Sequence, residues 1–277
     1  MIFSEQFYQS EKKGYLNEEF RLFHIKDQTG QEFSYHYHDF HKVVIFLSGK
    51  VTYHIEGKAY HLKPRDILLV SQGAIHKPEI DPSVPYERYI FWIRNDLSMQ
   101  ELNTCFQKAT DHSFNLVRID SAVQEHLRDL LRELENSIKN KDFGDEILSN
   151  ALFTQFMVYV NRIFLQTSAV PDRRSYSSDS QVEQLLKYIN RNLTEDLSID
   201  RLSEKFFFSK YHMMRKFKNE TGYTIHNYIT SKRLLLARSL INEGTPVMKA
   251  AQMSGFNDYT TFVRSYKKQF GNAPSHV

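Results

Sequence analysis

The stretch GFNDYTTFVRSYKKQFGNAP, residues 255–274, lies close to the end of a chain of 277 residues. It holds Arg264 and two lysines among aromatic residues, between two glycines of the kind that mark helix ends. Phe262 and Tyr266 are four residues apart and share one helix face, which predicts a basic helix with a buried aromatic side. One such helix alone is typical of a solvated surface, so its meaning depends on the sequence that precedes it.

The same pattern occurs once more in the chain, in the stretch SKYHMMRKFK, residues 209–218. The equivalent positions are Arg215 and Arg264, Phe217 and Tyr266, and Lys218 and Lys267. In each copy a short predicted helix, a turn of three or four residues and a longer helix follow one another. The pattern therefore predicts a duplicated helix-turn-helix, whose second helix can enter the major groove of DNA.

The exposed face of each longer helix supplies the candidate DNA contacts. We expect Met213, Phe217, Phe262 and Tyr266 to face inward. The candidates for reading bases are Tyr211, Met214, Arg215, Tyr259, Thr260, Val263 and Arg264. The candidates for contacting phosphates, which position the protein without specifying sequence, are Ser209, Lys210, Lys218, Lys232, Asn257 and Lys267. An arginine can pair with guanine through two hydrogen bonds, whereas methyl-bearing side chains can contact thymine.

Charge and cysteine content support a DNA-binding segment in an intracellular protein. Residues 181–277 carry 15 Lys and Arg against 8 Asp and Glu, a balance of +7, while residues 1–180 carry 21 against 25, a balance of −4. A basic segment joined to a mildly acidic one indicates a polyanion-binding module. The single cysteine, Cys105, excludes an intramolecular disulfide and favours a reducing compartment. No apolar run has the length of a signal peptide or membrane span, so we expect a cytoplasmic protein without a membrane partner.

The first half of the chain predicts a different architecture. Between Phe33 and Arg94, short runs rich in Val, Ile, Tyr and Phe alternate with turns, which indicates a small antiparallel sandwich or barrel. Residues 121–140 and 146–166 then show helical spacing of apolar residues. Such a helix pair needs a surface to pack against, either the barrel or a second copy of itself. The polar stretch 167–180 has no periodicity and is the predicted linker.

Residues 181–274 resemble the DNA-binding domain of the AraC/XylS family of bacterial transcription regulators. The resemblance is carried by LSEKFFFSKYHMMRKFKNETG, YITSKRLLLARSLI and VMKAAQMSGFNDYTTFVRSYKKQFGNAP. It implies two helix-turn-helix units joined by a long helix at residues 224–244, with both recognition helices in adjacent major grooves of promoter DNA. It also implies a homodimer that can contact RNA polymerase. Two departures are small: Ser203 replaces a usual alanine, and the chain stops at PSHV.

The segment GQEFSYHYHDFHKVVIFLSG, residues 30–49, is similar to the first motif of the cupins in the spacing of Gly30, His36, His38 and Gly49. His76 supplies a third imidazole at the place of the second motif. Where metal-binding cupins carry a glutamate, this chain has Lys42, which would repel a metal and attract a carboxylate or phosphate. Structural histidines, an organic ligand and a metal remain three readings of the group.

The resulting prediction is an α+β multidomain protein. It comprises a cupin-like ligand-sensing β-barrel at 1–95, a helical dimerisation and relay region at 96–166, the linker at 167–180 and an all-α DNA-binding domain at 181–277. The predicted ligand-binding residues are His36, His38, Lys42, His76, Arg88 and Trp92. Alternation along the last strand places Arg88 and Trp92 on one face. We expect no metal, no cofactor and no catalytic residue.

The predicted function is a sequence-specific transcription regulator, activator or repressor, controlled by a sugar or another small polar metabolite. Two alternatives remain. One is a metal-dependent cupin enzyme with an appended DNA-binding domain, and the other is a constitutive DNA-binding protein whose barrel serves only dimerisation. The sequence contains no nucleophile triad, phosphate-binding glycine loop or paired-carboxylate motif that would support catalysis.

Overall fold

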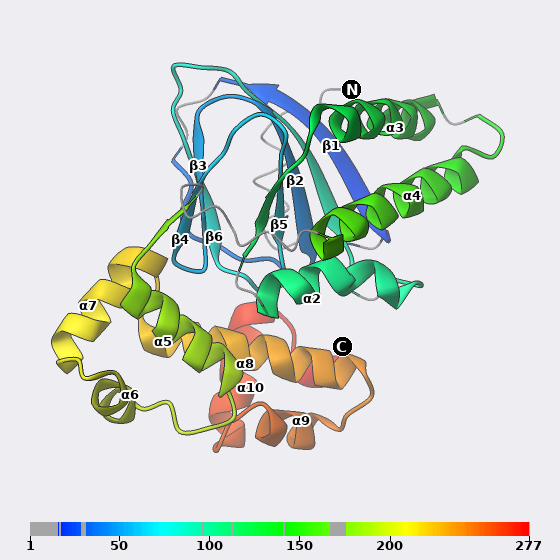
Figure 1. Ribbon diagram of the computed structural model, residues 1–277. Helices are drawn as coiled ribbons and strands as arrows, with labels where there is room; N and C mark the ends of the chain where they lie inside the picture. Colours follow the sequence, from blue (N-terminus) through cyan, green and yellow to red (C-terminus); the bar gives the residue numbers. More distant parts are fainter. Residues whose placement is uncertain are drawn as a thin grey trace. The chain divides into compact units, whose positions relative to one another are not determined.

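The computed structural model describes residue 16 and residues 18–28, 32–95, 97–111, 114–140, 142–166 and 176–276. The chain forms two compact units, one built mainly from residues before Ser178 and the other mainly from Ser178 onward (Figure 1). Each unit is described by itself. Along the described ranges, no helix combines the length and the apolar character that a membrane span requires.

Two β-sheets form the first unit. The larger sheet has the order β1-β7-β2-β5-β8 and the smaller has the order β6-β3-β4-β9. The strands of the larger sheet are Phe20–Asp27 (β1), His41–Ser48 (β2), Asp66–Val70 (β5), Tyr86–Ile93 (β7) and Leu116–Arg118 (β8). Those of the smaller are Val51–Ile55 (β3), Lys58–His61 (β4), His76–Ile80 (β6) and Tyr176–Ser178 (β9). All four pairings of the larger sheet are antiparallel, as the short strands and close turns of the sequence predict.

Strand β2 explains why the first unit needs helices as well as a second sheet. Its residues Val44 and Phe46 face the core between the sheets, while Val43 and Ile45 face the other way. Because both faces are apolar, both must be covered, and the strand is a continuous hydrophobic run instead of an alternating one. Each large apolar side chain buried in this way stabilises the fold by roughly 1.5–3 kcal/mol.

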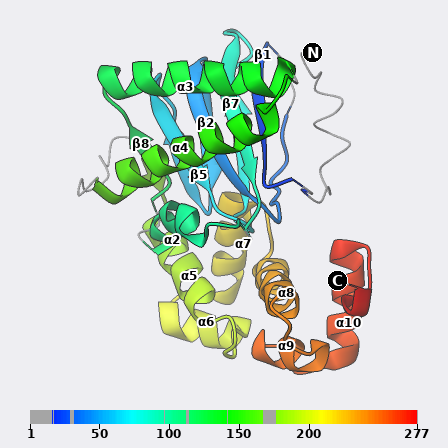
Figure 2. The ribbon, with the colours of Figure 1, turned by 90° about the vertical axis from the view of Figure 1, so that its right-hand side faces the viewer.

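Helices cover the outer face of the larger sheet, as Figure 2 shows. They are the 3₁₀ turn Gln100–Asn103 (η1) and the helices Thr104–Asp111 (α2), Ser121–Asn140 (α3) and Asp145–Gln166 (α4). Leu131 of α3 and Phe156 of α4 share one core with Val43 and Phe91 of the sheet. The rings of Phe91 and Phe156 stack with centroids 4.2 Å apart. The sheet is therefore the partner surface that the helix pair requires.

The apolar runs at residues 42–48, 51–56, 66–70 and 86–93 correspond to β2, β3, β5 and β7, whereas β1, β4, β6, β8 and β9 are strands that no such run predicts. Strand β8 lies within residues 96–166, which were expected to be helical, and its three residues pair with β5. So short a strand has no periodicity of its own. Of the predicted linker, residues 167–175 lie outside the described residues, and β9 and the start of α5 occupy the rest.

The second unit is helical. Its helices are Ser180–Arg191 (α5), Ile199–Phe206 (α6), Lys210–Thr221 (α7), Ile225–Asn242 (α8), Val247–Met253 (α9) and Tyr259–Phe270 (α10), followed by the 3₁₀ turn Pro274–His276 (η2). Helices α6 and α7 form one helix-turn-helix, α9 and α10 form the other, and α8 joins them. Asp179 caps the start of α5 by accepting hydrogen bonds from the backbone of Gln181 and Val182. Leu234 of α8, Ala251 of α9 and Phe262 of α10 share one core.

Candidate functional site

The inward faces of the two longer helices are those that the sequence predicted. Met213 and Phe217 of α7 and Phe262 and Tyr266 of α10 are all buried. Phe217 packs edge-to-face against Tyr228 of α8, with ring centroids 5.4 Å apart. Because these inward residues are held by packing, the rotation of each helix about its own axis is fixed, and so is the set of side chains that faces solvent.

The outward faces hold most of the predicted base-reading residues. Tyr211, Met214 and Arg215 are exposed on α7, and on α10 the exposed members of the predicted set are Tyr259, Thr260 and Arg264. Val263 differs from the prediction, because it is only partly exposed and packs against the core formed by α8, α9 and α10. It follows Phe262 directly, so a turn of about 100° leaves it at the edge of the buried face.

The start of the longer helix differs between the two helix-turn-helix motifs. The Ser209 hydroxyl accepts a hydrogen bond from the backbone N–H of His212 at the start of α7, whereas the Asp258 carboxylate accepts one from Thr261 at 2.6 Å in α10. Hydrogen bonds from Thr261 lower the pKa of Asp258 below its usual value, so this cap is anionic at neutral pH. A carboxylate in that position repels a phosphate. Of the predicted phosphate contacts of this helix-turn-helix, Asn257 is next to the cap, whereas Lys267 lies in the last turn of α10, away from it.

The other predicted phosphate contacts lie in varied surroundings. Lys218 and Lys267 are exposed on the outward sides of α7 and α10. Lys210 forms an ion pair with Asp200, whose hydrogen bond raises the lysine pKa. Lys232 lies on α8, partly buried, with its ammonium 5.3 Å from the centroid of the Tyr228 ring. Lys218 and Lys267 are thus the better placed of these lysines.

Lys216 was not singled out from the sequence. Its Nζ atom lies 2.8 Å from the Asp179 carboxylate and 2.7 Å from Oε1 of Gln181. These contacts attach α7 to the start of α5. No local sequence pattern predicts these contacts of Lys216, because the partners are more than thirty residues apart.

Phe207 occupies the turn of the first helix-turn-helix in an unusual backbone conformation. It has a φ of 54°, in the left-handed region, and its side chain is 95% exposed. The following N–H of Phe208 donates to the Ser203 carbonyl at 3.0 Å, which closes the helix end. In the second helix-turn-helix Gly255 holds the corresponding place at the end of α9, with a φ of 90°. A glycine adopts this conformation without the steric cost that Phe207 incurs.

Replacing Phe207 with glycine is therefore expected to stabilise the second unit by about 1 kcal/mol, the order of the cost of a left-handed side chain. The measurement is urea unfolding followed by the helical circular dichroism signal. Phe207→Ala is the matched control, because it removes the ring and keeps the Cβ atom that causes the strain. Equal stabilisation by both variants would contradict the backbone explanation.

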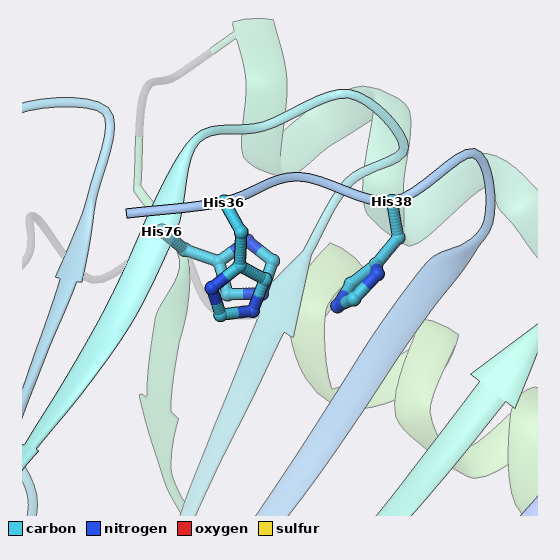
Figure 3. Close-up of side chains that lie close together, drawn as sticks. All are labelled: His36, His38 and His76. Atoms are coloured by element: carbon cyan, nitrogen blue, oxygen red, sulfur yellow. The ribbon is translucent and has the colours of Figure 1, made fainter. Parts of the chain in front are cut away.

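Three of the predicted ligand-binding histidines come together. One nitrogen from each of His36, His38 and His76 lies within 4.8 Å of the others, as Figure 3 shows. Lys42 of β2 is buried, and its Nζ atom lies 3.3 Å from Nε2 of His38 and 3.1 Å from Nε2 of His76. Trp92 of β7 is paired directly opposite Lys42 in the sheet. Gly30 of the sequence motif lies outside the described residues.

Arg88 lies apart from this group. It shares a strand face with Trp92, as alternation predicted, but it lies four residues before Trp92 in β7, paired opposite Phe46. Four residues of strand span about 13 Å. Its Nη1 atom is 2.7 Å from Asp27 of β1 and donates to the Tyr86 carbonyl at 3.1 Å. The expectation that Arg88 joins the ligand-binding residues is corrected accordingly, because its contacts hold β7 to β1.

Three further strand histidines, His41, His54 and His61, do not belong to this group. His41 is buried in β2, where burial lowers its pKa to about 4 and keeps the ring neutral. Its Nδ1 accepts from the backbone N–H of Gln72 at 3.0 Å, while its Nε2 lies 2.9 Å from the Asn95 side-chain oxygen. His54 contacts Glu79 on the smaller sheet. His61 is exposed.

A sheet domain with a clustered polar interior and a helical domain with two helix-turn-helix units define a DNA-binding transcription regulator with a ligand-binding domain. Comparison with known families agrees: an AraC-like ligand binding domain matches residues 22–157, and a helix-turn-helix domain matches residues 202–277. The chain belongs to the AraC/XylS family of transcription regulators.

The chain is similar to named relatives over most of its length. The HTH-type transcriptional activator RhaS of Citrobacter koseri is 23% identical over 248 residues, which cover 88% of this chain and 87% of the relative. RhaS of Escherichia coli is 22% identical over 249 residues, covering 89% and 87%. Among solved structures, ToxT from Vibrio cholerae is 15% identical with a TM-score of 0.38, covering 93% of this chain and 96% of that one. The family assignment rests on the domain matches and the RhaS relatives.

Proposed function

We propose that this chain reads promoter DNA with α7 and α10 in two adjacent major grooves, and that a small effector bound in the first unit changes this binding. One observation carries the DNA-reading part. Two helices of matching design each bury an aromatic face and expose an arginine at the equivalent position, Arg215 and Arg264. They lie in a segment of balance +7, which attracts the phosphate backbone.

The effector part of the proposal concerns His36, His38, Lys42, His76 and Trp92. Imidazoles and an ammonium offer hydrogen bonds to hydroxyl, carboxylate or phosphate groups, and an indole offers a flat apolar surface. This set suits a sugar or another small polar metabolite. The relatives named as transcriptional activators support a regulatory role over an enzymatic one.

We further propose that the protein acts in the cytoplasm as a homodimer and contacts RNA polymerase at its promoters. The apolar side chains at the turn between α3 and α4 support association with another protein surface. They are Ile138, Phe143, Ile147 and Leu148, all of which are exposed. Exposed apolar groups that lie close together are typical of interaction sites.

The effector proposal is tested by separating ligand response from DNA binding. Sugars, sugar phosphates and small acids are screened by thermal shift, and each hit is tested for its effect on operator affinity by fluorescence anisotropy. Lys42→Ala and Trp92→Ala are expected to bind operator as the wild type does without effector, and to lose the response to it. His61→Ala is the control, since His61 is an exposed histidine of the same unit.

A hit that alters operator affinity equally in Lys42→Ala and in the wild type would contradict this effector site. If none of the compounds alters DNA affinity, the result favours a barrel that serves only dimerisation, and the DNA-reading part of the proposal is unaffected.

A further inference from the structure

One arginine of α8 holds the segment that leads into the first helix-turn-helix. Arg233 donates from Nε to the Leu193 carbonyl and from Nη2 to the Glu195 carbonyl, both at 2.7 Å. These carbonyls belong to residues 192–198, which connect α5 to α6. A guanidinium is a rigid planar fork, so two charge-assisted hydrogen bonds from it fix the orientation of the backbone that accepts them.

The same segment packs closely against the end of α9, in the second helix-turn-helix. A Cβ atom added at Gly255 would lie 2.7 Å from the Leu193 carbonyl oxygen and 3.1 Å from Cα of Thr194. It would also lie 2.9 Å from Nε of Arg233. Glycine is the residue that permits so close an approach of two backbones. The end of α9, the guanidinium and residues 192–198 therefore meet at one point.

Along α8, Arg233 lies between the residues that hold the two recognition helices. Tyr228 packs against Phe217 of α7, with ring centroids 5.4 Å apart. Leu234 shares a core with Phe262 of α10. Each of these contacts orients one recognition helix on α8. Arg233 adds a direct link between the two motifs, which resists twisting and bending of the helix that joins them.

We propose that Arg233 and Gly255 form a clasp that sets the separation and angle between α7 and α10, and so restricts the chain to operators with one spacing between the two contacted positions. Arg233 is a positioning residue in this role, because it acts on the recognition helices through the backbone that it holds. The inference rests on the proposed reading of DNA by both helices. One additional base pair turns a contact site by about 35° around the duplex and moves it by about 3.4 Å. A rigid pair of helices cannot follow that change, whereas a loosened pair can.

The test measures how strictly the full-length chain requires one operator spacing. The probe is a duplex selected from random sequences by the wild-type protein, together with duplexes that have one base pair inserted or deleted between the positions read by Arg215 and Arg264. In fluorescence anisotropy, the wild type is expected to bind the altered duplexes at least about 5-fold more weakly, the low end of the loss of one arginine–guanine pair. Arg233→Met is expected to reduce this spacing penalty to less than about 2-fold, because a loosened pair of helices keeps both contacts.

Arg238→Met is the matched control for the lost charge. It removes a guanidinium from the same helix, where Arg238 lies 4.7 Å from the centroid of the Phe270 ring, and it is expected to keep the wild-type spacing penalty.

A second pair of variants tests the clasp without altering charge. Gly255→Ala introduces a Cβ that collides with Arg233 and the backbone beside it. Gly244→Ala is its control, because Gly244 has nearly the same φ, 89°, and its added Cβ meets no atom of the described residues within 4 Å beyond its immediate neighbours. Both variants incur the same backbone strain, but only Gly255→Ala is expected to reduce the spacing penalty.

The clasp is overturned if either Arg233→Met or Gly255→Ala, when folded, discriminates between the spacings as strictly as the wild type does. It is also overturned if the wild type accepts the altered spacings without penalty, or if Arg238→Met or Gly244→Ala loses the penalty too, since general loosening of the unit would then explain the result. Thermal unfolding followed by circular dichroism shows which variants are folded, and one folded variant of the two suffices. If the wild type selects no duplex, the DNA-reading proposal fails together with the clasp, whereas a selected duplex with unchanged discrimination removes the clasp alone.

Discussion

Replacing both Arg215 and Arg264 with alanine is expected to weaken binding to the operator by about 2–6 kcal/mol, since each bidentate arginine–guanine pair contributes about 1–3 kcal/mol of discrimination. Both side chains are exposed at equivalent positions of α7 and α10. Binding to unrelated DNA should change much less, because it depends on phosphate contacts. The measurement is anisotropy with operator and scrambled duplexes at several salt concentrations.

The single variants locate the two contacts on DNA. Arg215→Ala and Arg264→Ala should each relax base preference at one position, and the two positions should lie about one helical turn apart. Lys218→Ala is the matched control on α7, expected to weaken binding to all sequences and to lower the salt slope by about 1. If footprints and base preferences of both arginine variants equal those of the wild type, the assigned recognition face is wrong.

Replacing Arg118 with methionine is expected to destabilise the first unit by about 3 kcal/mol. Arg118 of β8 donates from Nε and Nη2 to the two carboxylate oxygens of Asp66, at 2.7 and 3.0 Å. Asp66 is fully buried, and burial raises its pKa. Removing the arginine leaves a buried carboxylate without its cation, which typically costs 3–5 kcal/mol, and the partial exposure of Arg118 places this case at the low end.

Unfolding of the first unit can be followed selectively, because Trp92 is the single tryptophan of the chain. Urea unfolding of Arg118→Met is compared with that of the double variant Arg118→Met, Asp66→Asn. The double variant is expected to recover much of the loss, since the buried charge is absent. A double variant as unstable as Arg118→Met would show that the arginine contributes through its packing and not through the ion pair.

The helices and strands that could be predicted from sequence are those with a clear apolar pattern within their own residues. Helix α3 begins and ends where the apolar spacing predicts, and strands β2, β5 and β7 coincide with runs of Val, Ile, Leu and aromatic residues. Strand β6 contains Pro78 between polar residues and becomes a strand through pairing with β3. Its position is set by the neighbouring strand, which a local pattern does not contain.

The same distinction holds for the candidate sites. The buried faces of α7 and α10 follow from residues four apart, so Phe217 and Phe262 could be placed from sequence. The partial burial of Val263 depends on how three helices pack, and the pairing of Arg88 with Asp27 joins strands that are distant in sequence. Because these contacts are non-local, strand alternation alone places Arg88 with Trp92 among the predicted ligand-binding residues. It does not reveal that Arg88 contacts Asp27 of β1.

The helix caps differ, with Ser209 on α7 and Asp258 on α10, and we expect this difference to make the two helices approach DNA differently. A phosphate can approach the neutral start of α7 directly, whereas the start of α10 carries a negative charge that must be kept away from the backbone. We expect the first helix-turn-helix to make the early, sequence-independent encounter with the duplex. The second is expected to bind stably only where Arg264 can pair with a matching base. The first helix-turn-helix would then serve the search for a site, and the second would serve its recognition.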